Sequence, residues 1–156
     1  MFLIAILVVS VANLLVGVLQ TGLMLKQPPA TATESSFELP AKYDAVVLAK
    51  VARRITEPFN RGDLDGLYNA FDEAAKLQMS RETFEVQVKA LDLFGKVEAA
   101  SYETARKVQN EWGNTYELKY IVKLSGGRFN SGQMTVIVID RASDLGIWGF
   151  NINGTQ

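Results

Sequence analysis

The absence of two residue types limits the chemistry that the side chains of this chain could perform. The sequence has no histidine and no cysteine. Imidazole is the commonest general base and metal ligand near neutral pH, and a thiolate is a strong nucleophile and soft metal ligand. Histidine-containing triads and metal sites and cysteine zinc sites are therefore excluded, and no cofactor is indicated. Catalysis would depend on carboxylates, tyrosines, lysines or arginines.

Two aspartates, Asp72 and Asp140, lie at the ends of expected secondary-structure elements. Asp72 follows the second expected helix, and Asp140 ends the third expected strand. Burial can raise the pKa of a carboxyl group into a range useful for a general base. A structural role is the alternative, because Asp140 stands next to Arg141 and such a pair at a strand end usually forms an ion pair or a turn cap.

Three tyrosines and two apolar residues lie on shared faces of expected elements. Tyr116 and Tyr120 share one strand face with Leu118 because strand side chains alternate with a period of two. Tyr68 and Phe71 lie on one side of a short helix. In the alternative interpretation, Tyr68 belongs to the core with its hydroxyl group at the rim.

Three amphipathic helices are expected before the sheet. The first spans 41–59, with apolar residues at every fourth position and a basic, solvated side containing Lys50, Arg53 and Arg54. Pro58 is expected to bend or end it. The second follows Gly62 with Asp63 as its N-cap, and the third runs from the N-cap Ser80 to Phe94, where Gly95 stops it. The apolar residues are Val47, Val51, Ile55 and Phe59 in the first helix; Leu64, Leu67, Tyr68 and Phe71 in the second; and Phe84, Val88 and Leu91 in the third.

After Gly95 the hydrophobic period changes to two, which predicts four strands separated by turns rich in glycine, asparagine and serine. Three helices followed by an antiparallel meander indicate an α+β domain, with the helices packed on one face of a curved sheet. The expected strands are Val97–Gln109, Thr115–Leu124, Gln133–Asp140 and Gly146–Asn153.

This layout resembles the nuclear transport factor 2-like (cystatin-like, ketosteroid-isomerase-like) superfamily, particularly bacterial domains of unknown function behind a membrane anchor. The resemblance covers about residues 41–156. It implies a cone-shaped half-barrel around an apolar pocket and frequent dimerisation through the sheet. The residues that carry it are Phe59-Asn60-x-Gly62-Asp63, then Leu67, Tyr68 and Phe71, then a helix from Ser80 to Phe94-Gly95-Lys96.

The superfamily contains isomerases, dehydratases and cyclases as well as non-catalytic binding modules, so the fold does not select a function. Its enzymes often use an aspartate base inside the cone and a tyrosine that donates to an oxyanion. The resemblance therefore implies catalytic candidates and a ligand pocket. The catalytic candidates are Asp72, Asp140 and Tyr116, and the pocket candidates are Tyr68, Phe71, Tyr116, Leu118 and Tyr120.

The last strand suggests an interface. If Ile147 and Asn151 face the helices, then Trp148, Phe150 and Ile152 face outward, and a row of exposed aromatic residues usually marks a contact surface. Such a surface would suit a homodimer or an envelope protein partner, and Trp112 is a further candidate surface residue. In the opposite register these side chains are core.

The first forty residues predict a membrane tether. Residues 1–25 carry no charge and as a helix would be roughly 37 Å long, enough to span a bilayer core of about 30 Å. A cleaved signal peptide is the alternative, with Ala30-Thr31-Ala32 as a cleavage pattern. Residues 26–40 are rich in Pro, Thr and Ser, which indicates a linker. Lys26, the only charge at either end of the segment, would favour a cytoplasmic domain by the positive-inside rule. A single N-terminal span before a globular domain is more often a signal anchor, so a single-pass membrane protein with an extracytoplasmic domain, periplasmic or at the cell surface, is expected.

The sequence thus favours a membrane-tethered, non-enzymatic binding or interaction module for an apolar small molecule or a protein partner. The alternative is an isomerase or lyase using an Asp/Tyr pair, and a third interpretation is a structural part of a membrane complex. Sixteen basic and seventeen acidic residues leave a net charge of −1, so the composition does not indicate nucleic-acid binding.

Overall fold

The structure is a computed structural model that describes residues 38–108 and 113–155. The predicted membrane segment, most of the predicted linker and Trp112 lie outside these ranges. Among the residues described, no helix is both long enough and apolar enough to cross a membrane.

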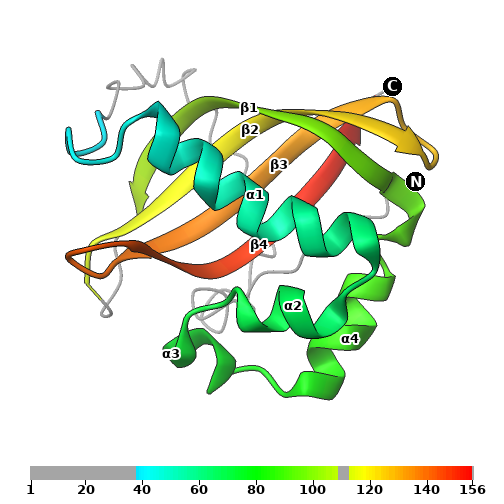
Figure 1. The fold of residues 1–156 in the computed structure, drawn as a ribbon, viewed down its shortest axis with the longest axis horizontal. Helices are drawn as coiled ribbons and strands as arrows, with labels where there is room; N and C mark the ends of the chain where they lie inside the picture. The colour runs from blue at the N-terminus through cyan, green and yellow to red at the C-terminus, as the bar shows by residue number, and fades with distance from the viewer. Residues whose placement is uncertain (1–37, 109–112, 156) are drawn as a thin grey trace, which may run out of the picture.

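A four-stranded antiparallel sheet forms one layer of the domain, and the helices cover one of its faces (Figure 1). The strands lie in chain order, so each pairs with its neighbour in sequence, and the predicted α+β meander is confirmed. Their bounds are Gly95–Val108 (β1), Thr115–Gly126 (β2), Ser131–Asp140 (β3) and Leu145–Thr155 (β4).

The helices differ from prediction mainly at their ends. The expected third helix is shorter, because Leu91 and Phe94 donate backbone hydrogen bonds to residues three positions earlier and tighten the chain into a 3-10 turn. A further four-residue helix, α3, was not expected. The bounds are Ala45–Arg61 (α1), Leu64–Asn69 (α2), Glu73–Lys76 (α3), Arg81–Lys89 (α4) and Asp92–Phe94 (η1, the 3-10 turn).

Helix α1 runs through Pro58 instead of ending there. Asp44 caps its start by accepting from the Val47 amide at 2.9 Å. A proline so close to the helix end removes one hydrogen bond of the last turn. The end itself is set by Gly62 at φ 66°, after which the Asp63 amide donates to the Pro58 carbonyl at 2.9 Å.

The core lies between α1 and the helix-facing side of the sheet. On β2 the predicted alternation is confirmed: one side is buried, whereas Ile121 on the other side is 49% exposed. The buried residues of α1 and β2 in this layer are Leu48, Val51, Ala52, Ile55, Tyr116, Leu118, Tyr120, Val122 and Leu124.

The expected outward row on β4 is wrong. Trp148, Phe150 and Ile152 are all buried, and the Phe150 ring lies 6.4 Å from Phe59 and 6.2 Å from Phe71. The cause is an irregularity in the β3–β4 pairing that adds a residue to β4 and shifts the alternation within the strand. Because of this extra residue, the side chains of β4 do not simply alternate between the two faces of the sheet.

Both outer edges of the sheet carry local features that limit pairing with another strand. On β4, the Asp72 amide donates to the Ile147 carbonyl at 2.7 Å. On β1, the Asn60 side chain donates to the Val97 carbonyl and accepts from the Val97 amide, both at 2.8 Å. Register shifts in β1 coincide with Glu98 and Glu103. The edge of β1 is thus clamped at one point and interrupted at two.

Removing the Asn60 clamp should have a modest cost. We expect Asn60→Ala to lower the free energy of unfolding by about 1 kcal/mol, because two hydrogen bonds are lost but water can reach an edge strand. Asn69 is an exposed asparagine, so Asn69→Ala is the matched control and should change stability by less than about 0.5 kcal/mol. Urea unfolding measures both, and equal effects would contradict a stabilising clamp.

Candidate functional site

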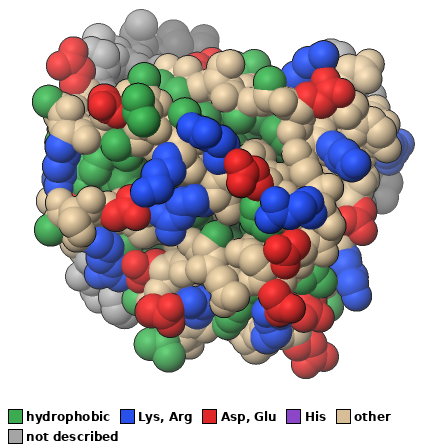
Figure 2. All heavy atoms as spheres, viewed as in Figure 1, with side chains coloured by type: hydrophobic (Ala, Val, Ile, Leu, Met, Phe, Trp, Pro, Cys, Tyr) green, Lys and Arg blue, Asp and Glu red, His purple; other side chains and the backbone are tan. Residues whose placement is uncertain are grey.

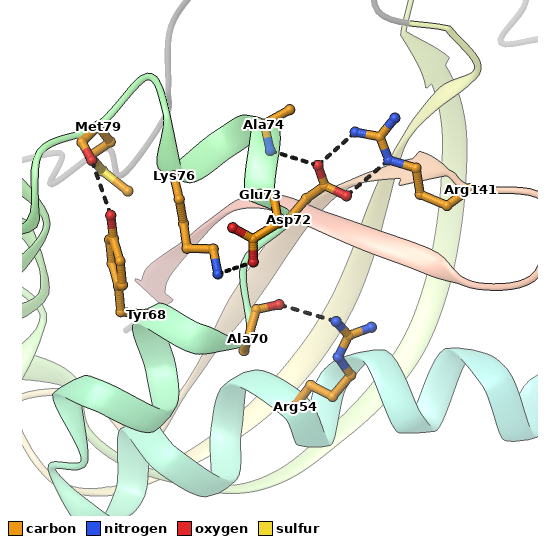
Figure 3. A network of polar contacts seen from close by, with 9 residues as sticks. All are labelled: Arg54, Tyr68, Ala70, Asp72, Glu73, Ala74, Lys76, Met79 and Arg141. Atoms are coloured by element: carbon orange, nitrogen blue, oxygen red, sulfur yellow. Dashed lines mark hydrogen bonds and ion pairs between the residues drawn. The ribbon is translucent and has the colours of Figure 1, made fainter.

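The first candidate base, Asp72, is held in a structural network (Figure 3). Its carboxylate accepts two hydrogen bonds from the Arg141 guanidinium, at 2.9 and 2.6 Å. It also caps α3 by accepting from the Ala74 amide at 3.0 Å. Arg141 is the main reason that the pKa of Asp72 lies below its ordinary value. Asp72 is therefore a poor proton acceptor near neutral pH.

The surroundings of Asp72 contain further hydrogen bonds that hold the chain around α2 in place. Arg54 of α1 donates to the Ala70 carbonyl at 3.1 Å (Figure 3). It also donates to the Leu145 carbonyl at 2.8 Å. The Tyr68 hydroxyl donates to the Met79 carbonyl at 3.5 Å. The Arg54 bonds join α1 to the end of α2 and to the start of β4. The Tyr68 bond joins α2 to the chain before α4. Both side chains therefore have structural roles.

The second candidate base, Asp140, lies at the end of β3 with a lysine and two tyrosines close by. Lys42 donates to its carboxylate at 3.0 Å, and so does the Ala142 amide at 2.9 Å. The neighbouring Tyr43 hydroxyl and Lys42 both hold the pKa of Asp140 below its ordinary value. Burial, and then the charge of Asp140, raises the pKa of Tyr116. This arrangement stabilises ionised aspartate and protonated tyrosine.

The predicted cone pocket is filled by packed side chains. Phe71, Tyr116, Leu118 and Tyr120 are each at most 3% exposed, and Tyr68 packs on the buried Phe84 ring at 5.1 Å. The Tyr120 hydroxyl donates to the Leu48 carbonyl of α1 at 2.9 Å, and burial raises the pKa of Tyr120 well above its ordinary value. Tyr116 lies near Asp140, whereas Tyr120 is bonded to α1.

The buried hydroxyl group gives a direct test of a structural role for Tyr120. We expect Tyr120→Phe to lower the free energy of unfolding by about 1 kcal/mol, because one buried hydrogen bond is lost while the ring is kept. Tyr102 is 40% exposed and provides the control: Tyr102→Phe should be nearly neutral. Thermal and urea unfolding measure the difference, and an unchanged Tyr120→Phe variant would contradict the assigned bond.

A pocket of about 190 Å³ lies away from the cone, where the end of α1 meets α2 and α4. None of the five predicted pocket residues lines it. Sequence reasoning missed it because helix periodicity identifies apolar faces but not the angle at which three helix ends meet. Its lining residues are Pro58, Phe59, Gly62, Asp63, Leu64, Leu67, Val88, Lys89 and Asp92.

The fold and this site define an α+β domain with a helix-covered antiparallel sheet and a small pocket between its helices. No protein-family model matches the chain, and no curated protein matches it. A solved structure from Nostoc punctiforme, described as a protein of unknown function with a cystatin-like fold, is similar, with 17% identity and a TM-score of 0.48 over 76% of this chain and 96% of that chain. Aln2 from a Streptomyces species is similar with 15% identity and a TM-score of 0.43, over 75% and 94% of the two chains.

Proposed function

We propose that this protein is a non-enzymatic binding module of the nuclear transport factor 2-like superfamily, tethered to a membrane by residues 1–25 with its domain on the extracytoplasmic side. In this proposal, the pocket between α1, α2 and α4 receives a small apolar group of a ligand or of an envelope protein. The Gly62–Asp63 junction after α1 and the strand meander support the superfamily assignment.

The observation that carries the non-enzymatic part is the state of the two candidate bases. Asp72 is bonded to Arg141 and Asp140 to Lys42, and both carboxyl groups have lowered pKa values. A general base for carbon acids works best with a pKa near the working pH, which requires a shift in the opposite direction. The isomerase or lyase alternative would have to use Asp140 with Tyr116, its nearby tyrosine, despite that shift.

The pocket between the helices has the chemistry of a small binding site. Leu67 and Val88 are buried beneath it and Phe59 is half-buried, so its floor is apolar. Charged Lys89 and Asp92 are exposed at its rim. Drug-sized ligands usually occupy about 300–1,000 Å³, so a pocket of about 190 Å³ fits one side chain or one small apolar moiety.

Native mass spectrometry of the full chain, extracted from its host in mild detergent, tests this proposal. We expect an additional mass, from a small molecule or a partner protein, that is released on denaturation. Leu64→Trp adds a large ring to the lining and should remove that mass. Val86→Trp is the matched control, because Val86 is 66% exposed on α4 and does not line the pocket.

The two variants separate the outcomes. Loss of the additional mass from Leu64→Trp alone would support binding in the pocket, provided that this variant unfolds like the wild type when followed by circular dichroism. A bare wild-type chain, or a mass that persists in Leu64→Trp, would overturn the proposed pocket. Turnover of a bound molecule that stops in Asp140→Asn would favour the enzyme instead.

A further inference from the structure

We propose that the outer face of α1 docks on an anionic phospholipid surface, which orients the domain against the membrane. This inference rests on the proposed tether, but it concerns a surface separate from the pocket. The docking face consists of five residues that lie on α1 or beside it: Val46, Ala49, Lys50, Arg53 and Tyr102.

The basic part of the docking face follows from the helix period. Lys50 and Arg53 are three residues apart, so they project from the same side of α1, and both are exposed. Figure 2 shows basic side chains gathered over α1 near the middle of this face of the molecule. Each basic residue close to an anionic leaflet contributes attraction within roughly a Debye length.

Lys50 and Arg53 remain available for such a contact. Neither forms an ion pair or a side-chain hydrogen bond with any residue that the structure describes. Arg54, next in the chain, is instead held by the Leu145 and Ala70 carbonyls. The acidic residue that shares their side of the helix is Glu57, which is exposed and lies one turn closer to the C-terminus.

The docking face also has an exposed apolar part next to its basic residues. Val46, one turn before Lys50, is 71% exposed at the start of α1. Tyr102 is 40% exposed, and its ring lies 5.9 Å from Tyr120, whose hydroxyl is bonded to Leu48 of α1. Tyr102 therefore lies beside the first half of the helix. A tyrosine beside basic residues suits the headgroup level of a bilayer, where the ring is partly buried and the hydroxyl stays wet.

The position of α1 in the chain favours a membrane over a soluble anion. Ala45 follows Leu25 by 20 residues, and fully extended chain spans at most ~3.3–3.6 Å per residue. A spanning segment at residues 1–25 would therefore keep the start of α1 within about 70 Å of the bilayer. The docking face would meet lipid headgroups at high local concentration, and even weak attraction would then orient the domain.

The absence of cysteine makes this orientation measurable. The full chain with Ala49→Cys, labelled with a fluorophore, is inserted into nanodiscs of phosphatidylcholine alone or mixed with phosphatidylglycerol, each with a headgroup quencher. We expect quenching that depends on phosphatidylglycerol and weakens at high salt. Lys50→Gln together with Arg53→Gln should shift the docking equilibrium by about 30-fold, from roughly fivefold for each charge.

Matched controls test the face and the source of the anion. Lys96→Gln with Lys119→Gln removes two basic residues from the face of the sheet that points away from α1, where they pair with Ser125 and Thr135, and should leave quenching unchanged. A label at Val86→Cys on α4 should not be quenched. Inorganic phosphate added at constant ionic strength should not compete, whereas efficient competition would indicate a soluble anion site and overturn the membrane proposal.

The outcomes also separate this inference from the proposed function. A chain that inserts into both kinds of disc but shows equal quenching in them overturns the docking face and leaves the tether standing. A chain that does not insert overturns the tether and the docking face together. The pocket is judged by the mass measured for Leu64→Trp, which neither result changes.

Discussion

Replacing Phe150 with alanine is expected to lower the free energy of unfolding by about 3–5 kcal/mol. Phe150 is 1% exposed and packs its ring against Phe59 of α1 and against Phe71, which lies between α2 and α3, so the substitution removes a buried ring and leaves a cavity between the sheet and these two segments. Equilibrium urea unfolding, followed by tryptophan fluorescence and circular dichroism, measures the loss.

The matched control for Phe150 is Ile121 on the opposite face of the sheet. Ile121 is 49% exposed, and Ile121→Ala should change stability by about 0.5 kcal/mol or less. An outward-facing Phe150 at an interface would give a different result: the variant would stay as stable as the wild type and would lose only its self-association. That outcome would contradict the buried position of β4.

Asp72→Asn is expected to lower the free energy of unfolding by about 2 kcal/mol at neutral pH. The substitution weakens charge-assisted hydrogen bonds to Arg141 and the cap of α3, although the exposure of Arg141 allows solvent to screen part of the ion pair. A double-mutant cycle with Arg141→Gln should show coupling: the double variant loses less than the sum of the single variants.

The same pair predicts a pH dependence with a definite sign. Arg141 lowers the pKa of Asp72 in the folded state, so the unfolded chain binds more protons between the two pKa values. The stabilisation is complete above the unfolded value of about 3.9 and is lost as the pH falls through the folded value. The gap between wild type and Asp72→Asn should therefore narrow below about pH 4.

A result that contradicts the structural role of Asp72 is easy to recognise. If Asp72 were a catalytic base with a raised pKa, Asp72→Asn would be as stable as the wild type or more stable near neutral pH. Its gap to the wild type would then not narrow in acid. Acid unfolding of both proteins, followed by circular dichroism, separates the two cases.

The parts of the fold that sequence predicted well are those governed by one strong local signal. The alternation of β2 was predicted because large apolar side chains alternate with charged ones along the strand. Ile121 is the one apolar residue at a position where a charged residue is expected. Helix α1 was predicted from its period to about Phe59, with a bend or an end at Pro58, but its continuation to Arg61 was not predicted. The end at Arg61 is set by Gly62 and by the hydrogen bond that the Asp63 amide donates to the Pro58 carbonyl.

The candidate site was less predictable because its partners come from distant parts of the chain. Asp140 and Arg141 are neighbours in sequence and suggested a pair, yet Arg141 binds Asp72 and Asp140 binds Lys42. The turn-cap alternative for Asp140 is confirmed by its bond from Ala142. No local pattern specifies which of several charges meet after folding, or that an extra residue in β4 turns Phe150 inward.

The order of the chain has a consequence for its synthesis. Each strand pairs with the strand made just before it, so the sheet can form hairpin by hairpin. Helix α1 is the first of the described elements to leave the ribosome, but Leu48 meets Tyr120 72 positions later and Arg54 meets Leu145 91 positions later. The apolar side of α1 therefore stays uncovered while most of the domain is translated, and chaperones have their longest opportunity to bind the chain at this helix.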